Sequence, residues 1–91
     1  MAHFKSQDDA LLKRVRRIAG QVTAIERALC GADDCTKTLH LVAATRGAIN
    51  GLMDEIIEAH VREHVARPDL SDYERAAGAE ELIAAIRRYS R

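Results

Sequence analysis

The sequence of this 91-residue chain predicts an all-α fold. Apolar residues recur at steps of three and four, which is the spacing of one face of an α-helix. Strand-type alternation of apolar and polar residues is absent, and Pro68 is the single proline. Because proline is the strongest helix breaker, long stretches can stay helical. We expect one domain over residues 1–91, built as a long antiparallel helical hairpin followed by a short third helix.

The first helix is expected over residues 6–29. Its apolar positions are Leu11, Leu12, Val15, Ile18, Val22, Ile25 and Leu29. Ser6 can cap its first turn, because a serine hydroxyl accepts a hydrogen bond from a free backbone N–H. Gly31 ends the helix, and residues 32–34 form a short loop.

The second helix is expected over residues 35–65, with Asp34 as its N-cap. The proline in the turn at residues 67–69 marks its end, because proline cannot continue a helix. A third, shorter helix fits residues 71–89, where Gly78 is a weak point because glycine lowers helix stability.

Three helices of these lengths cannot bury all their apolar residues within one chain. The second helix would be about 45 Å long at 1.5 Å per residue, and a hairpin of that shape leaves apolar faces open. Gly20, Gly47 and Gly51 lie inside helices, where each glycine costs about 1 kcal/mol, so close helix approach is the expected compensation. Oligomerisation is the usual remedy for a marginal core, and we expect a homodimer and a larger symmetric assembly.

Net charge and the distribution of apolar residues limit the classes of function that the sequence can have. The formal net charge is zero, so any argument for nucleic acid must come from the distribution of charge. The sequence has no apolar run long enough for a membrane span, and its first residues lack the apolar core of a signal peptide. The expected location is therefore the cytoplasm, where Cys30 and Cys35 would be reduced thiols.

Histidines and one cysteine form a candidate metal site. His60 and His64 are four residues apart on one helix and can chelate one metal ion, although a solvated helix face is the simpler interpretation of such a pair. Cys35 lies on the same predicted helix about 37 Å away. Two antiparallel copies of that helix would bring Cys35 of one chain to the histidines of the other, and the hairpin places His3 beside them. The four residues then converge in a dimer as two symmetric sites.

Other chemistry-bearing residues near these positions have simpler interpretations. We expect Cys30 to be a buried small apolar residue, because free cysteine is often buried. His40 is expected on the helix surface or at an interface. His3 could equally be part of an unanchored chain terminus.

Cations gather on the first helix and at two places on the second. They are Lys13, Arg14, Arg16, Arg17, Lys37 and Arg46. A solvated helix face is one interpretation, and contact with DNA phosphates is the other. The acidic residues cluster elsewhere, which favours DNA. Because aromatic residues are few, we expect contacts with phosphates and groove shape rather than base stacking.

Two other function classes are weaker. An enzyme could use Cys35 as nucleophile and His60 as base, but the sequence offers no oxyanion loop and no glycine-rich pocket. A structural helical interaction module is the remote alternative.

Specific segments carry a resemblance to a known family. They are KRVRRIAGQV, the Cys35 that opens the second helix, LVAATRGAINGLMDEIIEAH and HVREH. The whole chain resembles the repressors that sense copper, nickel and cobalt, or formaldehyde (the CsoR, RcnR and FrmR types). The resemblance implies a three-helix protomer assembled as a dimer of dimers, a tetramer that represses an adjacent efflux or detoxification operon until an effector binds. It places DNA contacts on Arg14, Arg17 and Arg46, with Lys13, Arg16 and Lys37 as additions.

The residues at the metal-ligand positions distinguish the copper-sensing members of this family from the nickel- and cobalt-sensing ones. The resemblance implies that copper-type members bind their metal with two cysteines and one histidine. This chain has His64 where the second of those cysteines would lie. Nickel/cobalt-type members share His3, Cys35, His60 and His64, and this nitrogen-rich set suits Ni(II), Co(II) or Zn(II). The predicted function is therefore a DNA-binding repressor released by Ni(II) or Co(II), with Zn(II) as a further metal.

Formaldehyde sensing is the alternative that stays open. Formaldehyde-type members pair the equivalent of Cys35 with an N-terminal proline, and their last ligand position is acidic. This chain has Ala2 and His64 at those positions. The segments RVRRIAGQ and IERAL nevertheless resemble that branch as much as the nickel branch. In this alternative formaldehyde reacts with Cys35 and the N-terminal amine.

Overall fold

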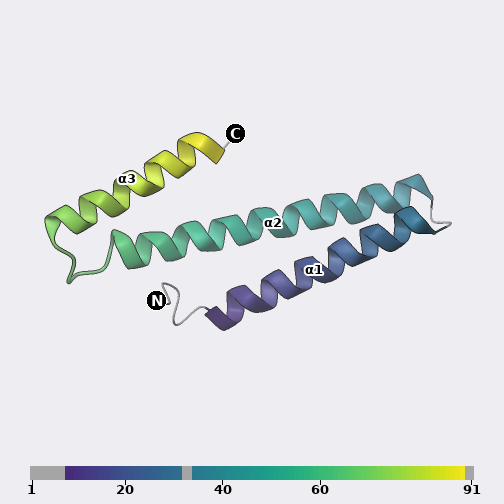
Figure 1. Cartoon of the computed structure of the whole chain (residues 1–91), viewed down its shortest axis with the longest axis horizontal. Helices are drawn as coiled ribbons and strands as arrows, with labels where there is room; N and C mark the ends of the chain where they lie inside the picture. The colour runs from purple at the N-terminus through teal and green to yellow at the C-terminus, as the bar shows by residue number, and fades with distance from the viewer. Residues whose placement is uncertain (1–7, 32–33, 90–91) are drawn as a thin grey trace. The chain divides into compact units, whose positions relative to one another are not determined.

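The computed structural model describes residues 8–31 and 34–89, and these residues form three helices with no strand. The helices are α1 (Asp8–Cys30), α2 (Cys35–His64) and α3 (Asp72–Tyr89) (Figure 1). The predicted all-α fold is confirmed. The predicted start of the first helix at residue 6 lies outside the described residues, and the other five helix ends agree with the prediction to within one residue. The predicted cap Ser6 lies outside the described residues.

Side chains before α2 and α3 cap both helices. The Asp34 carboxylate accepts a hydrogen bond from the backbone N–H of Lys37 at 2.7 Å, which confirms the predicted N-cap. At α3, the Ser71 hydroxyl accepts from the N–H of Glu74 at 3.0 Å, and the Glu74 carboxylate accepts from the N–H of Ser71 at 2.8 Å. This reciprocal pair is a capping box, which satisfies two backbone donors at the helix start.

The described chain divides into two compact units, one formed by residues 8–54 and the other by residues from 55 onward. In the first unit, α1 and the first part of α2 run in opposite directions (Figure 1). In the second, α3 folds back along the last part of α2. The division lies within a continuous helix, so the single domain over residues 1–91 stays a prediction.

The chain alone buries few side chains. Among residues 8–31 and 34–89, the buried apolar ones are Leu11, Ala28 and Ala59, and no large side chain of this part is fully buried. Many large apolar side chains of α1 and α2 are at least one third exposed. They are Leu12, Val15, Val22, Leu29, Leu39, Val42, Ile49, Met53 and Ile56. The predicted open apolar faces are confirmed, and none of the described helices is long and apolar enough to cross a membrane.

The glycines inside α1 and α2 differ in what surrounds them. A Cβ built on Gly51 would lie 2.6 Å from the Arg14 guanidinium, so this glycine makes room for a side chain of α1. At Gly20 and Gly47 nothing in the described chain lies within 4 Å of such an atom. Close approach of a helix from another chain at these two glycines therefore stays a prediction.

Candidate functional site

Two imidazoles lie together at the end of α2. His60 and His64 are both half-buried, and their ring centroids are 4.8 Å apart. This proximity follows from helix geometry, because residues four apart share one face. The structure therefore brings together two of the four predicted ligands on one face of α2.

A backbone carbonyl of α3 fixes the His60 ring. The Nε2 atom of His60 lies 2.9 Å from the carbonyl oxygen of Gly78. A carbonyl can only accept, so Nε2 donates in this bond, and the tautomer that binds a metal would then use the lone pair of Nδ1. Metal-binding histidines are commonly held by this type of bond to a backbone carbonyl. The arrangement thus fits a metal ligand whose free donor atom is Nδ1.

Gly78 holds α3 against the end of α2. It is buried, and a Cβ at this position would collide with the His64 carbonyl and lie 2.9 Å from the His64 Cβ. Only glycine allows the two backbones to approach this closely. Sequence reasoning treated Gly78 as a weak point and missed its contact with both histidines. The available signal was a glycine within an otherwise regular helical pattern.

Arg75 organises the turn between α2 and α3. Its guanidinium donates to the carbonyls of Val65 at 2.5 Å, Leu70 at 3.2 Å and Arg67 at 3.3 Å. These bonds give hydrogen-bond donors to carbonyls of the turn that follows α2, so they hold the turn in one conformation. The same turn holds the Arg67–Asp69 ion pair at 2.7 Å, and this hydrogen bond lowers the pKa of Asp69.

The remaining predicted ligands are not joined to the histidines by the described structure. Cys35 is the first residue of α2 and is exposed, whereas His64 is the last residue of the same helix. His3 lies outside the described residues. Among the described residues, no group of three or more histidines, cysteines and acids is placed to hold a metal.

Two neighbouring predictions have clear outcomes. Cys30 is exposed, so its predicted burial is wrong in the single chain. It is the last residue of α1, where few neighbours can cover the thiol. His40 is exposed on α2, as expected of a helix-surface residue.

The predicted DNA-contacting cations all lie in the unit formed by residues 8–54. All of them are exposed except Arg14, which is half-buried with its guanidinium beside Gly51. The exposed members are Lys13, Arg16, Arg17, Lys37 and Arg46. Exposed cations on a rigid helix can contact several phosphates, and such contacts make binding strongly dependent on salt.

Comparison with known proteins identifies the family. Residues 7–88 match the family described as metal-sensitive transcriptional repressors. The chain belongs to this repressor family. Since its members are transcriptional regulators, the enzyme and the structural-module alternatives are set aside.

Two curated relatives match most of this chain. The repressor is 45% identical over 98% of both chains to an uncharacterized protein from the bioA 5′ region of Serratia marcescens. It is 40% identical to an RcnR-homologue transcriptional repressor of Escherichia coli O139:H28, over 71% of this chain and 72% of that one.

A solved structure shows the same fold. It is a glutamate-to-histidine variant of the formaldehyde-responsive regulator FrmR from Salmonella enterica serovar Typhimurium. The TM-score is 0.88 at 40% identity, and the match covers 97% of this repressor and 99% of that chain. These relatives support a metal or formaldehyde effector without separating the two.

Proposed function

We propose that this repressor leaves its operator when Ni(II) or Co(II) binds Cys35 of one chain together with His3, His60 and His64 of another. Zn(II) is a further metal that the same ligands suit. One thiolate with several imidazoles is a donor set of borderline softness, whereas Cu(I) prefers a site richer in sulfur. As a DNA-binding protein, the repressor would act in the cytoplasm.

The single observation that carries this proposal is the bond between His60 Nε2 and the Gly78 carbonyl at 2.9 Å. It fixes the ring orientation and leaves Nδ1 as the donor, beside the His64 ring at 4.8 Å. Two neighbouring imidazoles with one already held by an outer partner form half of a metal site. The other half must come from elsewhere, because Cys35 begins the helix that His64 ends.

A second chain supplies the missing ligand in this proposal. The apolar side chains that one chain leaves open, such as Val42, Ile49 and Met53, are 46–47% exposed. Burying apolar surface stabilises association by about 25 cal/mol per Å². We infer an antiparallel homodimer and a tetramer formed from two dimers, in which Cys35 of each chain meets the histidines of its neighbour.

The DNA surface is the exposed cation group of α1 with Arg46 and Lys37 of α2. Metal binding draws Cys35 toward the histidines of the other chain and changes the spacing between these cations. Several phosphate contacts are then lost together. A coupling of about 1–3 kcal/mol between the metal and DNA sites is typical and gives a change in affinity of about 5- to 150-fold.

Formaldehyde is the second candidate effector. Cys35 is exposed and therefore accessible to a small electrophile, and the FrmR variant is 40% identical over nearly the whole chain. In that case Cys35 and the N-terminal amine react with formaldehyde, and His64 has no part in sensing.

The test is release of a labelled operator fragment from the purified repressor, with Ni(II), Co(II), Zn(II), Cu(I) and formaldehyde titrated separately. Cys35→Ala and His64→Ala are the test variants. Cys30→Ala and His40→Ala are matched controls, because each removes an exposed residue of the same type. Release by nickel or cobalt that both test variants abolish and both controls retain supports the metal site. Release by formaldehyde that requires Cys35 but not His64 refutes it in favour of the aldehyde branch.

The DNA surface has its own test. Arg17→Ala should weaken operator binding and reduce the slope of log affinity against log salt by about one. Arg27→Ala is the matched control, because Arg27 is an exposed arginine of α1 outside the cation group. If Arg17→Ala binds the operator as tightly as the parent does, α1 is not part of the DNA interface.

A further inference from the structure

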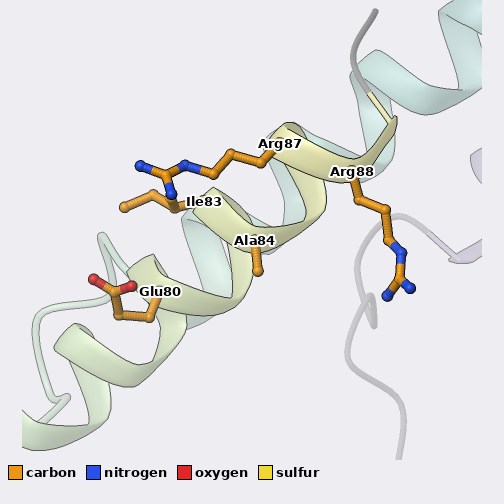
Figure 2. Close-up of a pocket in the computed structure, with 5 residues that line it drawn as sticks. All are labelled: Glu80, Ile83, Ala84, Arg87 and Arg88. Atoms are coloured by element: carbon orange, nitrogen blue, oxygen red, sulfur yellow. The ribbon is translucent and has the colours of Figure 1, made fainter.

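The contact between α3 and the last part of α2 is small. Four residues of α3 are not exposed: Arg75, Ala79 and Leu82 are half-buried, and Gly78 is buried. The five residues that line a shallow hollow on the opposite face of the helix are all exposed (Figure 2), namely Glu80, Ile83, Ala84, Arg87 and Arg88. Because only Ala79 and Leu82 add apolar side chains to the contact, hydrogen bonds must help to hold α3 in place.

Arg75 supplies three of these hydrogen bonds. Its Nη1 atom donates to the carbonyl of Val65 at 2.5 Å and to that of Arg67 at 3.3 Å, and its Nη2 atom donates to that of Leu70 at 3.2 Å. A guanidinium can reach separate acceptors in this way because its donors form a planar fork, whereas the lysine ammonium is a compact point charge. Val65 directly follows His64 in the chain, so Arg75 ties α3 to the end of the helix that carries both histidines.

Gly78 lies about one helical turn after Arg75. The two residues are three apart in the chain, share one face of α3 and are separated by about 4.5 Å along its axis. One turn of a hydrogen-bonded helix is stiff, so the bonds of Arg75 set the position of the Gly78 carbonyl. That carbonyl accepts from His60 Nε2 at 2.9 Å, and a Cβ on Gly78 would lie 2.9 Å from the His64 Cβ. A shift of α3 at Arg75 would therefore break the bond to the His60 ring.

We propose that Arg75 is a positioning residue of the metal site. It holds α3 where the Gly78 carbonyl accepts from His60 Nε2, and so raises the affinity for the metal without touching it. The inference rests on the proposed metal function and extends it to a residue outside the four ligands. Loss of an outer partner of a ligating histidine typically lowers metal affinity by about 10- to 100-fold. Because Arg75 acts through Gly78, we expect its loss to have an effect at the lower end of this range.

Binding of Ni(II) to the full-length repressor tests the consequence, measured by competition with a chromophoric chelator. Arg75→Ala should bind nickel about tenfold more weakly than the parent. Arg75→Lys keeps the charge but not the fork, so its affinity should fall as well. Ser71→Ala is the matched control, because it removes the hydroxyl that caps the start of α3 but none of the groups that Arg75 binds. The nickel affinity of this control should equal that of the parent.

A proton signal of the His60 ring tests the positioning itself, with no metal present. In a proton–nitrogen correlation spectrum of the metal-free repressor, the Nε2–H group of His60 should give a signal, because its bond to the Gly78 carbonyl slows exchange of this proton with water. His60→Gln identifies the signal by its absence. The signal should disappear in Arg75→Ala and Arg75→Lys and persist in Ser71→Ala. A general loss of stability would not produce this difference between the variants.

The inference is overturned if Arg75→Ala keeps both the proton signal and the nickel affinity of the parent. It is also overturned if Ser71→Ala loses as much affinity as Arg75→Ala, since general stability then sets the affinity. If Arg75→Lys matches the parent, the charge alone suffices and the argument from the guanidinium fork is wrong. A parent that gives the proton signal but binds no nickel refutes the proposed metal function instead, and the metal-free spectrum keeps the two failures apart.

Discussion

Replacing Gly78 with alanine should destabilise the repressor, although alanine is the better helix former. The added Cβ would collide with the His64 carbonyl and lie 2.9 Å from the His64 Cβ. Overpacking typically costs about 1–3 kcal/mol, and here the obstacle is backbone, which cannot rotate away. Alanine returns about 1 kcal/mol of helix propensity. We therefore expect a net loss of up to about 2 kcal/mol in the free energy of unfolding.

The measurement is urea unfolding followed by far-ultraviolet circular dichroism at fixed protein concentration. Ala77→Gly calibrates the experiment, because Ala77 is exposed on α3 and reports the helix-propensity difference alone. If Gly78→Ala is more stable than the parent by the amount that Ala77→Gly loses, the close approach of α3 to His64 is refuted.

Gly78→Ala should also lower the affinity of the proposed site for its metal. Separation of α3 from α2 removes the carbonyl that accepts from His60 Nε2. Loss of such an outer partner typically lowers metal affinity by about 10- to 100-fold. Competition with a chromophoric chelator measures that affinity. An unchanged affinity would show that Gly78 has no influence on metal binding.

Three further predictions follow from the capped turns and the glycines. Ser71→Ala removes the hydroxyl that accepts from the Glu74 N–H and should lower stability by about 1 kcal/mol in urea unfolding; no change would show that the capping box contributes nothing. Gly51→Ala displaces the flexible Arg14 guanidinium, so it should alter the salt dependence of operator binding and raise the free energy of unfolding in urea by up to about 1 kcal/mol, the gain in helix propensity. Bonding from Arg67 lowers the pKa of Asp69 below its ordinary value of 3.8. The stability from this carboxylate is thus fully present above that value and is lost as the pH falls through the lowered pKa. Asp69→Asn should show a smaller acid-induced loss in urea midpoints, and an identical pH profile would contradict this assignment.

The helices were predictable because their signals are local. Spacing of apolar residues, the Asp34 cap and the turn around Pro68 act within a few residues, and the described boundaries agree with them to within one residue. The His60–His64 pair was predictable for the same reason, since four residues on a helix fix the geometry.

What the sequence did not reveal depends on contacts between helices. The Gly78 carbonyl that holds His60, and the Arg75 guanidinium that binds three carbonyls of the turn, come from α3. Backbone acceptors carry no residue-specific signal, so a pattern search over side chains does not find them. The predicted burial of Cys30 was wrong because helix ends have few neighbours to cover a side chain.

Because the described part of the chain fully buries no large side chain, the lifetime of this repressor should depend on its concentration. A chain without partners keeps its apolar residues exposed, and such species are recognised by chaperones and proteases. Binding that occurs only in the folded state stabilises by mass action, so the melting temperature should rise with protein concentration. When synthesis slows, the surviving subunits assemble less completely and are degraded faster. The pool of repressor would then shrink more steeply than its rate of production, and the operator would open at a threshold rather than gradually.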